Sequence, residues 1–435
     1  MSEKNLPFSA KRAAAPKPFG YAAQLLHPGF QVALLFGLGV FGFWATSPLL
    51  SYAIAAESEG SIVALVLRTF VLLLALSVFL NARKLRNGLP LVLPLILFTV
   101  IYAYRMYDNF FIENYNIYID WVVAFSMLFG AGLIPSIILF YSAAYLSRQE
   151  DDLRVVMFAL MIMFLVGIFL NAELLYQRTE LQASLEKVNS IAMTSIATSF
   201  ALFAVLQLRN GGVILSALSI ACLVGLAAIA AIAKARGPLV GTAVSLLAYF
   251  LLIPGRQRAQ LIKVLAVGAA GLIALQFFSG FNLFEEMLSK FDYVEDGGAG
   301  DSVSMRKLAW QAAWEQFLAD PFMGKLMYET ALGHYPHNIV LEVLMATGLV
   351  GAFFFGAYLF VSLRAAVFLM RRPDITMSQS FVVLMFFKEL TQNMFSGAVW
   401  GASGLMITSC CLIGMAEAAR RQPLAGMRSH GTTRT

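Results

Sequence analysis

Long apolar segments separated by short polar stretches repeat along the whole chain. Most are close to the ~20 residues that a helix needs to cross the hydrocarbon core of a bilayer. The ~10-residue alternating segments of a membrane β-barrel are absent from the sequence. The pattern therefore predicts an all-α polytopic membrane protein with about 12 transmembrane helices. The expected spans are residues 30–50, 61–80, 89–104, 121–146, 154–171, 190–208, 212–233, 238–254, 261–280, 345–370, 379–395 and 399–417.

Composition agrees with burial in lipid. The 435 residues are 59% hydrophobic and only 13% charged. The net charge of +6 does not indicate a nucleic-acid partner, because the basic residues lie in short loops and tails. All three cysteines fall inside apolar segments, so they predict neither a disulfide framework nor a zinc site. The first apolar segment is too long for a signal peptide and is expected to be an uncleaved span.

Loops rich in lysine and arginine alternate with loops that are poor in them. Because basic loops stay on the cytoplasmic side, both termini are expected to be cytoplasmic and the long acidic loop to be extracytoplasmic. ATP is not available there, so a reaction at that face must use an activated substrate. The expected division is a cytoplasmic tail 1–29, transmembrane helices 1–9 in 30–280, a large periplasmic loop 281–344 with short amphipathic helices, transmembrane helices 10–12 in 345–418, and a cytoplasmic tail 419–435.

The large loop contains a helical pattern that starts at Asp301 or Ser302 and stops at Asp320. One face of this helix would carry Arg306 together with Trp310, Ala313, Trp314 and Phe317. A cation on an apolar face has two interpretations. Arg306 either extends to lipid phosphates at the membrane surface or points into a polar cavity beneath the helix, and spacing alone does not separate them.

The end of the loop holds two of the four histidines, His334 and His337. A helix is expected to restart at His337, with Asn338 in its first turn. A helix N-terminus favours a neutral imidazole and attracts anions, and a neutral imidazole is what a general base requires. The alternative is an interfacial histidine that only caps a helix.

Four more charged residues stand out. Arg236 is expected to end one span, before a Gly-Pro break, and it is either a phosphate ligand or a helix-end arginine that extends to the lipid headgroups. Arg68 lies inside the second expected span. Lys388 and Glu389 lie deep in the eleventh, where charges line a cavity or form a buried pair. Because they are adjacent on one helix, Lys388 and Glu389 are expected to face different ways.

Four segments together resemble the O-antigen ligase and O-antigen polymerase superfamily of bacterial envelopes. The family's His-Asn, nine residues, Gly, two residues, Gly motif fits His337, Asn338, Gly348 and Gly351. The other three segments are ARGPLVG at 235–241, the pair Arg306 and Trp310, and Pro321 with Gly324. The chain departs from the family pattern at Ala235, where the family has serine, and at Leu326, where it has glycine.

The resemblance implies a GT-C-like fold in the bacterial inner membrane with its active site on the periplasmic face. It implies transfer of a glycan from undecaprenyl diphosphate to an acceptor hydroxyl, by inversion, with no cofactor and no metal. The partners would be the lipid-linked donor, a lipid A-core or growing glycan acceptor, and membrane lipid. His337 would be the catalytic base, and Arg236 and Arg306 would bind the diphosphate.

Secondary roles are considered for Asn338, His334, Lys388 and Glu389. Two other functions stay open at this point. The first is repeat-unit polymerase activity within the same superfamily. The second, from a different class, is transport of a polysaccharide or lipid-linked glycan, which the buried charges would suit.

Overall fold

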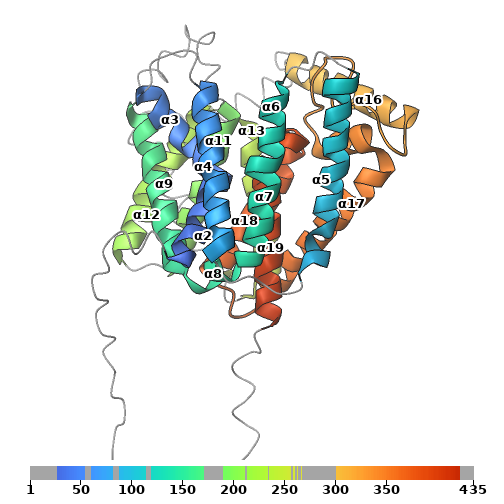
Figure 1. Ribbon diagram of the computed structural model, residues 1–435. Coiled ribbons are helices and arrows are strands. Elements are labelled where there is room, and N and C mark those ends of the chain that lie inside the picture. The colour runs from blue at the N-terminus through green and yellow to red at the C-terminus, as the bar shows by residue number, and fades with distance from the viewer. Residues whose placement is uncertain are drawn as a thin grey trace, which may run out of the picture.

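The computed structural model describes residues 27–53, 60–81, 88–113, 119–170, 190–210, 213–233, 235–255, 258–259, 262, 266 and 300–421. Every regular element in these ranges is a helix, and the helices form one bundle (Figure 1). The first half contains α2 Pro28–Gly37, η1 Leu38–Gly42, α3 Phe43–Ala53, α4 Gly60–Asn81, α5 Leu89–Tyr107, η2 Asp108–Ile112, α6 Trp121–Phe125, η3 Ser126–Leu133, α7 Ile134–Ser142, α8 Ala144–Arg148 and α9 Glu150–Leu170. The second half contains α11 Ser190–Asn210, α12 Val213–Ala233, α13 Arg236–Leu252, α16 Gly300–Ala319, α17 Ile339–Met370, α18 Met377–Asn393, η5 Val399–Gly401 and α19 Ser403–Arg420.

Within the described ranges, seven helical segments are long and apolar enough to cross a membrane. They are Pro28–Thr46, Ala64–Asn81, Leu89–Ile112, Trp121–Ser142, Glu150–Leu170, Ile191–Leu208 and Ile339–Met370. This confirms a helical, polytopic membrane protein. Other expected spans coincide with α12, α13, α18 and α19, whereas 261–280 lies almost wholly outside the described residues. The total of about 12 transmembrane helices therefore stays a prediction.

Aromatic rings pack the middle of the bundle. Phe41 of η1 lies 5.4 Å from Phe200 of α11, and Phe203 lies 5.4 Å from Phe381 of α18. Each of these rings is almost completely buried. Such pairs add about 0.5–1.5 kcal/mol each beyond the burial of their surface, so they hold the amino-terminal helices to the carboxy-terminal ones.

Helix α17 begins six residues before the expected span 345–370 and is kinked near its start. Its N-cap is Asn338, whose side-chain oxygen accepts from the backbone N–H groups of Val340 (3.0 Å) and Leu341 (3.2 Å). The expected helix start at His337 is therefore wrong by two residues, because an asparagine side chain satisfies the first free N–H groups. The kink is at Gly348, with φ 59° and ψ −160°, a conformation available almost only to glycine.

The connector 321–325 docks backbone to backbone against this kink. Lys325 N donates to Met345 O (3.0 Å), and Leu349 N donates to Pro321 O (2.8 Å). A Cβ on Gly348 would lie 2.3 Å from the carbonyl oxygen of Phe322. A Cβ on Gly324, which has φ 63°, would lie 2.6 Å from the backbone of α17 at Met345 O. The two motif glycines are thus explained by one close contact.

The end of α5 fixes the same connector. Arg105 donates through Nε to Ala346 O (3.0 Å) and through Nη2 to Gly324 O (2.6 Å). Asn109, fully buried, donates to Lys325 O (3.0 Å). These bonds join three segments that are far apart in sequence, and they fix the position from which α17 starts.

Candidate functional site

Helix α16 lies crosswise over one end of the bundle, above the start of α17 (Figure 1). Trp310 fastens it there, because its Nε1 donates to Pro336 O at 2.8 Å. Ala309, Ala313 and Phe317 form the buried face of α16. Trp314 is 46% exposed, so its expected place on that face is wrong.

Arg306 lies one turn before Trp310 and is partly buried. Its charge acts on two rings of the following turn: it lowers the pKa of His337 and opposes the rise in the pKa of Tyr335. Whether the Arg306 side chain enters a polar cavity beneath α16 or extends to lipid phosphates stays a prediction.

His337 has the strained backbone of this site. Its φ of 54° makes it the one non-glycine residue with positive φ among the described residues, and such conformations concentrate at functional sites. Its ring lies 4.3 Å from the ring of Tyr335. The Nδ1 atom of His337 is buried and has no hydrogen-bond partner. The ring therefore packs against Tyr335 and is not held by a hydrogen bond at Nδ1.

The pKa of His337 is lowered to about 4. The causes are burial first, then the charge of Arg306, then His334. Burial disfavours the imidazolium form, and a neighbouring cation disfavours it further. The ring is therefore neutral at neutral pH, as the sequence predicted, although the causes lie in burial and in Arg306.

Glu342 is a buried residue of this site that the sequence analysis missed. Its carboxylate accepts from the hydroxyl of Tyr102 (2.6 Å) and from the backbone N–H of Val399 (3.1 Å). It also contributes, after burial, to the raised pKa of Tyr335. One signal in the sequence could have identified it, namely an acidic residue in the apolar stretch directly after the His-Asn pair. Burial of an ionisable side chain inside a membrane span costs free energy unless the group has a partner, so such a residue is a candidate for a functional site.

The turn before His337 folds around a second carboxylate, that of Glu329. This fully buried side chain accepts from the backbone N–H groups of Ala331 (2.7 Å), Leu332 (2.9 Å) and His334 (3.4 Å). His334 is exposed on this turn. The two histidines are therefore placed differently, with His334 at the surface and His337 under α16.

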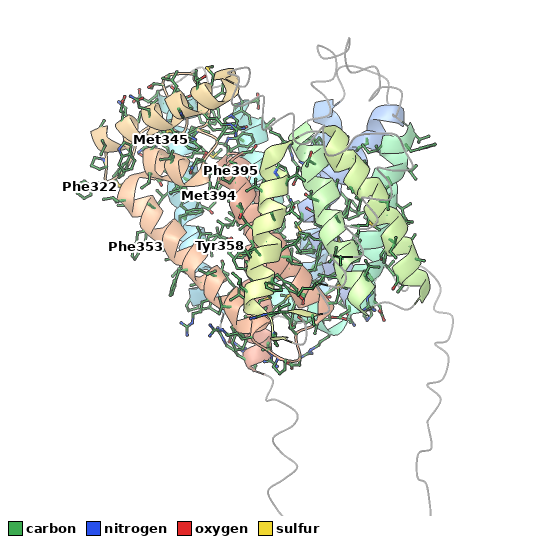
Figure 2. All side chains as sticks on the ribbon, turned by 180° about the vertical axis from the view of Figure 1, so that it is seen from behind. Phe322, Met345, Phe353, Tyr358, Met394 and Phe395 are labelled. Atoms are coloured by element: carbon green, nitrogen blue, oxygen red, sulfur yellow. The ribbon has the colours of Figure 1, made fainter. Side chains whose placement is uncertain are left out.

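Arg236 is the first residue of α13, so its expected place at the end of the preceding span is wrong. Pro238 lies in the first turn of α13, where the missing N–H breaks no helical bond. A Cβ on Gly237 would lie 3.8 Å from the Cβ of Phe395, and Figure 2 shows Phe395 beside α13. Phe395 precedes Val399, the partner of Glu342. The backbone of Arg236 is thus at this end of the bundle, and the approach of its side chain to His337 stays a prediction.

Lys388 and Glu389 form a buried pair, with 3.3 Å between Nζ and Oε1. The expectation that they face different ways is wrong, because the long lysine chain bends toward its neighbour. Lys388 Nζ also donates to Ser195 Oγ (2.8 Å) and to Gln392 Oε1 (3.0 Å). The ammonium group has three partners, as a buried charge requires. None of these partners is in α16 or α17, so the structure does not bring Lys388 together with His337.

No group of three or more His, Cys, Asp or Glu residues that could hold a metal ion occurs in the described part of the chain. The chemistry open to the junction of α16 and α17 comes from one neutral imidazole, one guanidinium and buried carboxylates. This set can take a proton from a hydroxyl and can hold an anion.

Comparison with known proteins points to the same part of the chain. The family model described as O-antigen ligase matches residues 220–356. No curated protein and no solved structure matches the chain. The matched segment contains α13, α16, the His337 turn and the kink of α17. The match confirms, over residues 220–356, the resemblance of this chain to the O-antigen ligase superfamily.

Proposed function

We propose that this protein is a membrane glycosyltransferase of the O-antigen ligase type. It would transfer a glycan from undecaprenyl diphosphate to a hydroxyl of lipid A-core at the periplasmic face. His337 would act as the general base, and Arg306 and Arg236 would hold the diphosphate. The observation that carries the proposal is the hydrogen bond from Trp310 Nε1 to Pro336 O, which fastens the helix of Arg306 beside the turn that holds the partly buried His337.

The reaction needs a base and an anion site. In the proposed step, the acceptor hydroxyl gives its proton to the imidazole of His337 as its oxygen attacks the anomeric carbon. The bond from that carbon to the diphosphate oxygen breaks, and the diphosphate leaves with the electron pair. Guanidinium groups match phosphate oxygens and stabilise the charge that develops on them. A single displacement of this kind inverts the anomeric centre.

A pKa of about 4 would make His337 a weak base in the empty site. The donor itself changes this. A bound diphosphate would bring negative charge beside the imidazole and offset the charge of Arg306, and both effects raise the pKa of a neighbouring histidine. The base would thus become stronger once the donor is bound. This coupling is consistent with Arg306 being among the causes of the low pKa.

The proposal is tested by replacing His337, Arg306 and Arg236 singly with alanine in a strain that lacks the enzyme. Surface glycan attachment is measured at matched protein levels. His27→Ala is the control, because His27 is an exposed histidine at the N-cap of α2 and is not part of the proposed site. We expect attachment to fall at least about 100-fold for His337→Ala and to be unchanged for the control. Normal attachment by His337→Ala would contradict the role of the base.

The acceptor is tested separately with purified protein and a lipid-linked glycan. Transfer that requires added lipid A-core identifies a ligase, whereas a growing ladder without it identifies a repeat-unit polymerase. The side of the membrane is tested by labelling a cysteine introduced at position 334, which is exposed. Labelling from the periplasm supports the proposed orientation, and labelling only from the cytoplasm contradicts it.

A further inference from the structure

Four arginines gather around the end of α17 farthest from His337: Arg364, Arg371, Arg372 and Arg420. They surround an open groove of about 530 Å³, with Phe368 in its wall. Nothing in the proposed transfer reaction uses this groove, since the 32 residues of α17 separate Asn338 from Arg371.

The groove follows from helical spacing. Phe368 follows Arg364 by four positions on α17, and Arg371 and Arg372 follow Phe368 by three and four positions just beyond the last helical residue, so the four lie on one side of this end. Arg420, from the last turn of α19, lies over the Phe368 ring at 4.7 Å, and Arg372 lies 5.9 Å from the same ring. Two helices thus place cationic groups around one aromatic side chain.

The arginines are not equivalent. Arg372 makes a two-bond ion pair with Asp374 (2.9 and 2.7 Å) and donates to Ala419 O (3.0 Å), so it joins the ends of α17 and α19. Arg420 is 3.7 Å from a carboxylate oxygen of Glu417.

Arg364 and Arg371 are exposed, and neither has an ion pair among the residues that the structure describes. The groove therefore has an excess of positive charge, and these two guanidinium groups are available to an anion.

The neighbouring surface of α17 is apolar. Phe360 is 64% exposed and Leu363 is 44% exposed, directly before Arg364 along the helix. A site with guanidinium groups at one edge and exposed apolar side chains at the other fits a molecule with an anionic phosphate head and hydrocarbon chains. A free phosphate ion would contact only the guanidinium groups and would leave the apolar edge of the site unoccupied.

We propose that this arginine groove binds the headgroup of an anionic phospholipid from the surrounding leaflet. Arg364 and Arg371 hold the phosphate, and the acyl chains lie along Phe360 and Leu363. The site lies at the opposite end of α17 from the proposed transfer site, and it does not depend on the reaction assigned there.

The test compares thermal unfolding of the purified protein in neutral detergent with added phosphatidylglycerol, phosphatidylcholine or inorganic phosphate. We expect phosphatidylglycerol to raise Tm by roughly 3–6 °C and the other two additives to raise it by less than about 1 °C. The double variant Arg364→Gln/Arg371→Gln should lose at least half of that shift. Arg148→Gln, an exposed arginine beside Ser147 at the same end of the bundle, should retain it.

An undiminished phosphatidylglycerol shift in the double variant would overturn the proposal. An equal shift with inorganic phosphate would overturn the assignment to a lipid. If the double variant does not purify as a folded protein, the single variant Arg371→Gln is measured by the same criterion. Native mass spectrometry gives a second readout, in which wild-type protein and Arg148→Gln retain a phosphatidylglycerol molecule that the double variant releases. Retention of that lipid by the double variant would count against the site.

Discussion

Substitution of Gly348 by alanine tests the kink on which the site depends. Gly348 has φ 59° and ψ −160°, and its added Cβ would lie 2.3 Å from Phe322 O and 2.6 Å from Met323 N. Both atoms belong to the backbone of the docked connector, so no side-chain rotation can make room. The connector would have to move away from α17.

The cost has two parts. A non-glycine residue in this backbone region costs about 1–3 kcal/mol. Lifting the connector breaks the bonds from Leu349 N to Pro321 O and from Val350 N to Phe322 O, each worth about 0.5–1.5 kcal/mol. The expected loss in the free energy of unfolding is therefore about 2–6 kcal/mol. A displaced connector also shifts the start of α17, so transfer should fall even at temperatures where the variant stays folded.

Gly356→Ala is the matched control. Gly356 lies in the same helix, and its added Cβ would meet nothing within 4 Å. Alanine should stabilise the helix there by up to about 1 kcal/mol. Thermal or denaturant unfolding of both variants in the same detergent decides the matter. If Gly348→Ala is as stable as Gly356→Ala, the explanation of the motif glycine is wrong.

Three other measurements test single contacts. Trp310→Phe keeps an aromatic side chain but loses the indole N–H that donates to Pro336 O, so it should lower the free energy of unfolding by about 1 kcal/mol. The transfer rate should fall even where the variant is folded, and an unchanged transfer rate would refute the positioning role. Glu342→Ala leaves Val399 N without its acceptor and should lower the free energy of unfolding by about 2 kcal/mol or more. Glu342→Gln keeps an acceptor oxygen and should be destabilised much less, so equal destabilisation of both variants would refute the role of this hydrogen bond. An NMR titration of His337 should give a pKa of about 4; because an unfolded histidine titrates near 6.5, the free energy of unfolding should fall as pH drops from 6.5 to 4, and a folded-state value near 6.5 would contradict the burial argument.

Much of this arrangement could be predicted from local sequence. The sequence predicts a helix that starts at Asp301 or Ser302 and stops at Asp320, close to the observed Gly300–Ala319, because helical periodicity and the Asp320-Pro321 stop are local. The expected cap at Asp301 or Ser302 is wrong, since both residues lie inside α16. The spacing from Asn338 to Gly348 likewise reflects one local unit, a capped first segment of α17 followed by its kink. These features depend on residues that are close together in sequence, so they can be recognised from one sequence.

Other features depend on partners far away in sequence. Glu342 was missed because its partner Tyr102 is 240 residues earlier and gives no sign in the sequence of this contact. Helical periodicity predicted that Lys388 and Glu389 face different sides of the helix. The hydrogen bonds of the Lys388 ammonium to Ser195 and Gln392 determine its actual direction, and periodicity does not reveal such contacts. The contribution of Arg306 to the pKa of His337 also required α16 to fold over α17. Long-range packing, and not local propensity, decides these contacts.

In the proposed reaction, His337 beneath α16 takes the acceptor proton. The most direct measurement is single-turnover transfer from a polyprenyl-diphosphate-linked glycan by purified wild type, His337→Ala and His334→Ala. We predict a rate about 10²–10⁴-fold lower for His337→Ala and less than about 10-fold lower for His334→Ala, whose side chain is exposed. A His337→Ala rate within about threefold of wild type, or an equal loss in both variants, would contradict the account.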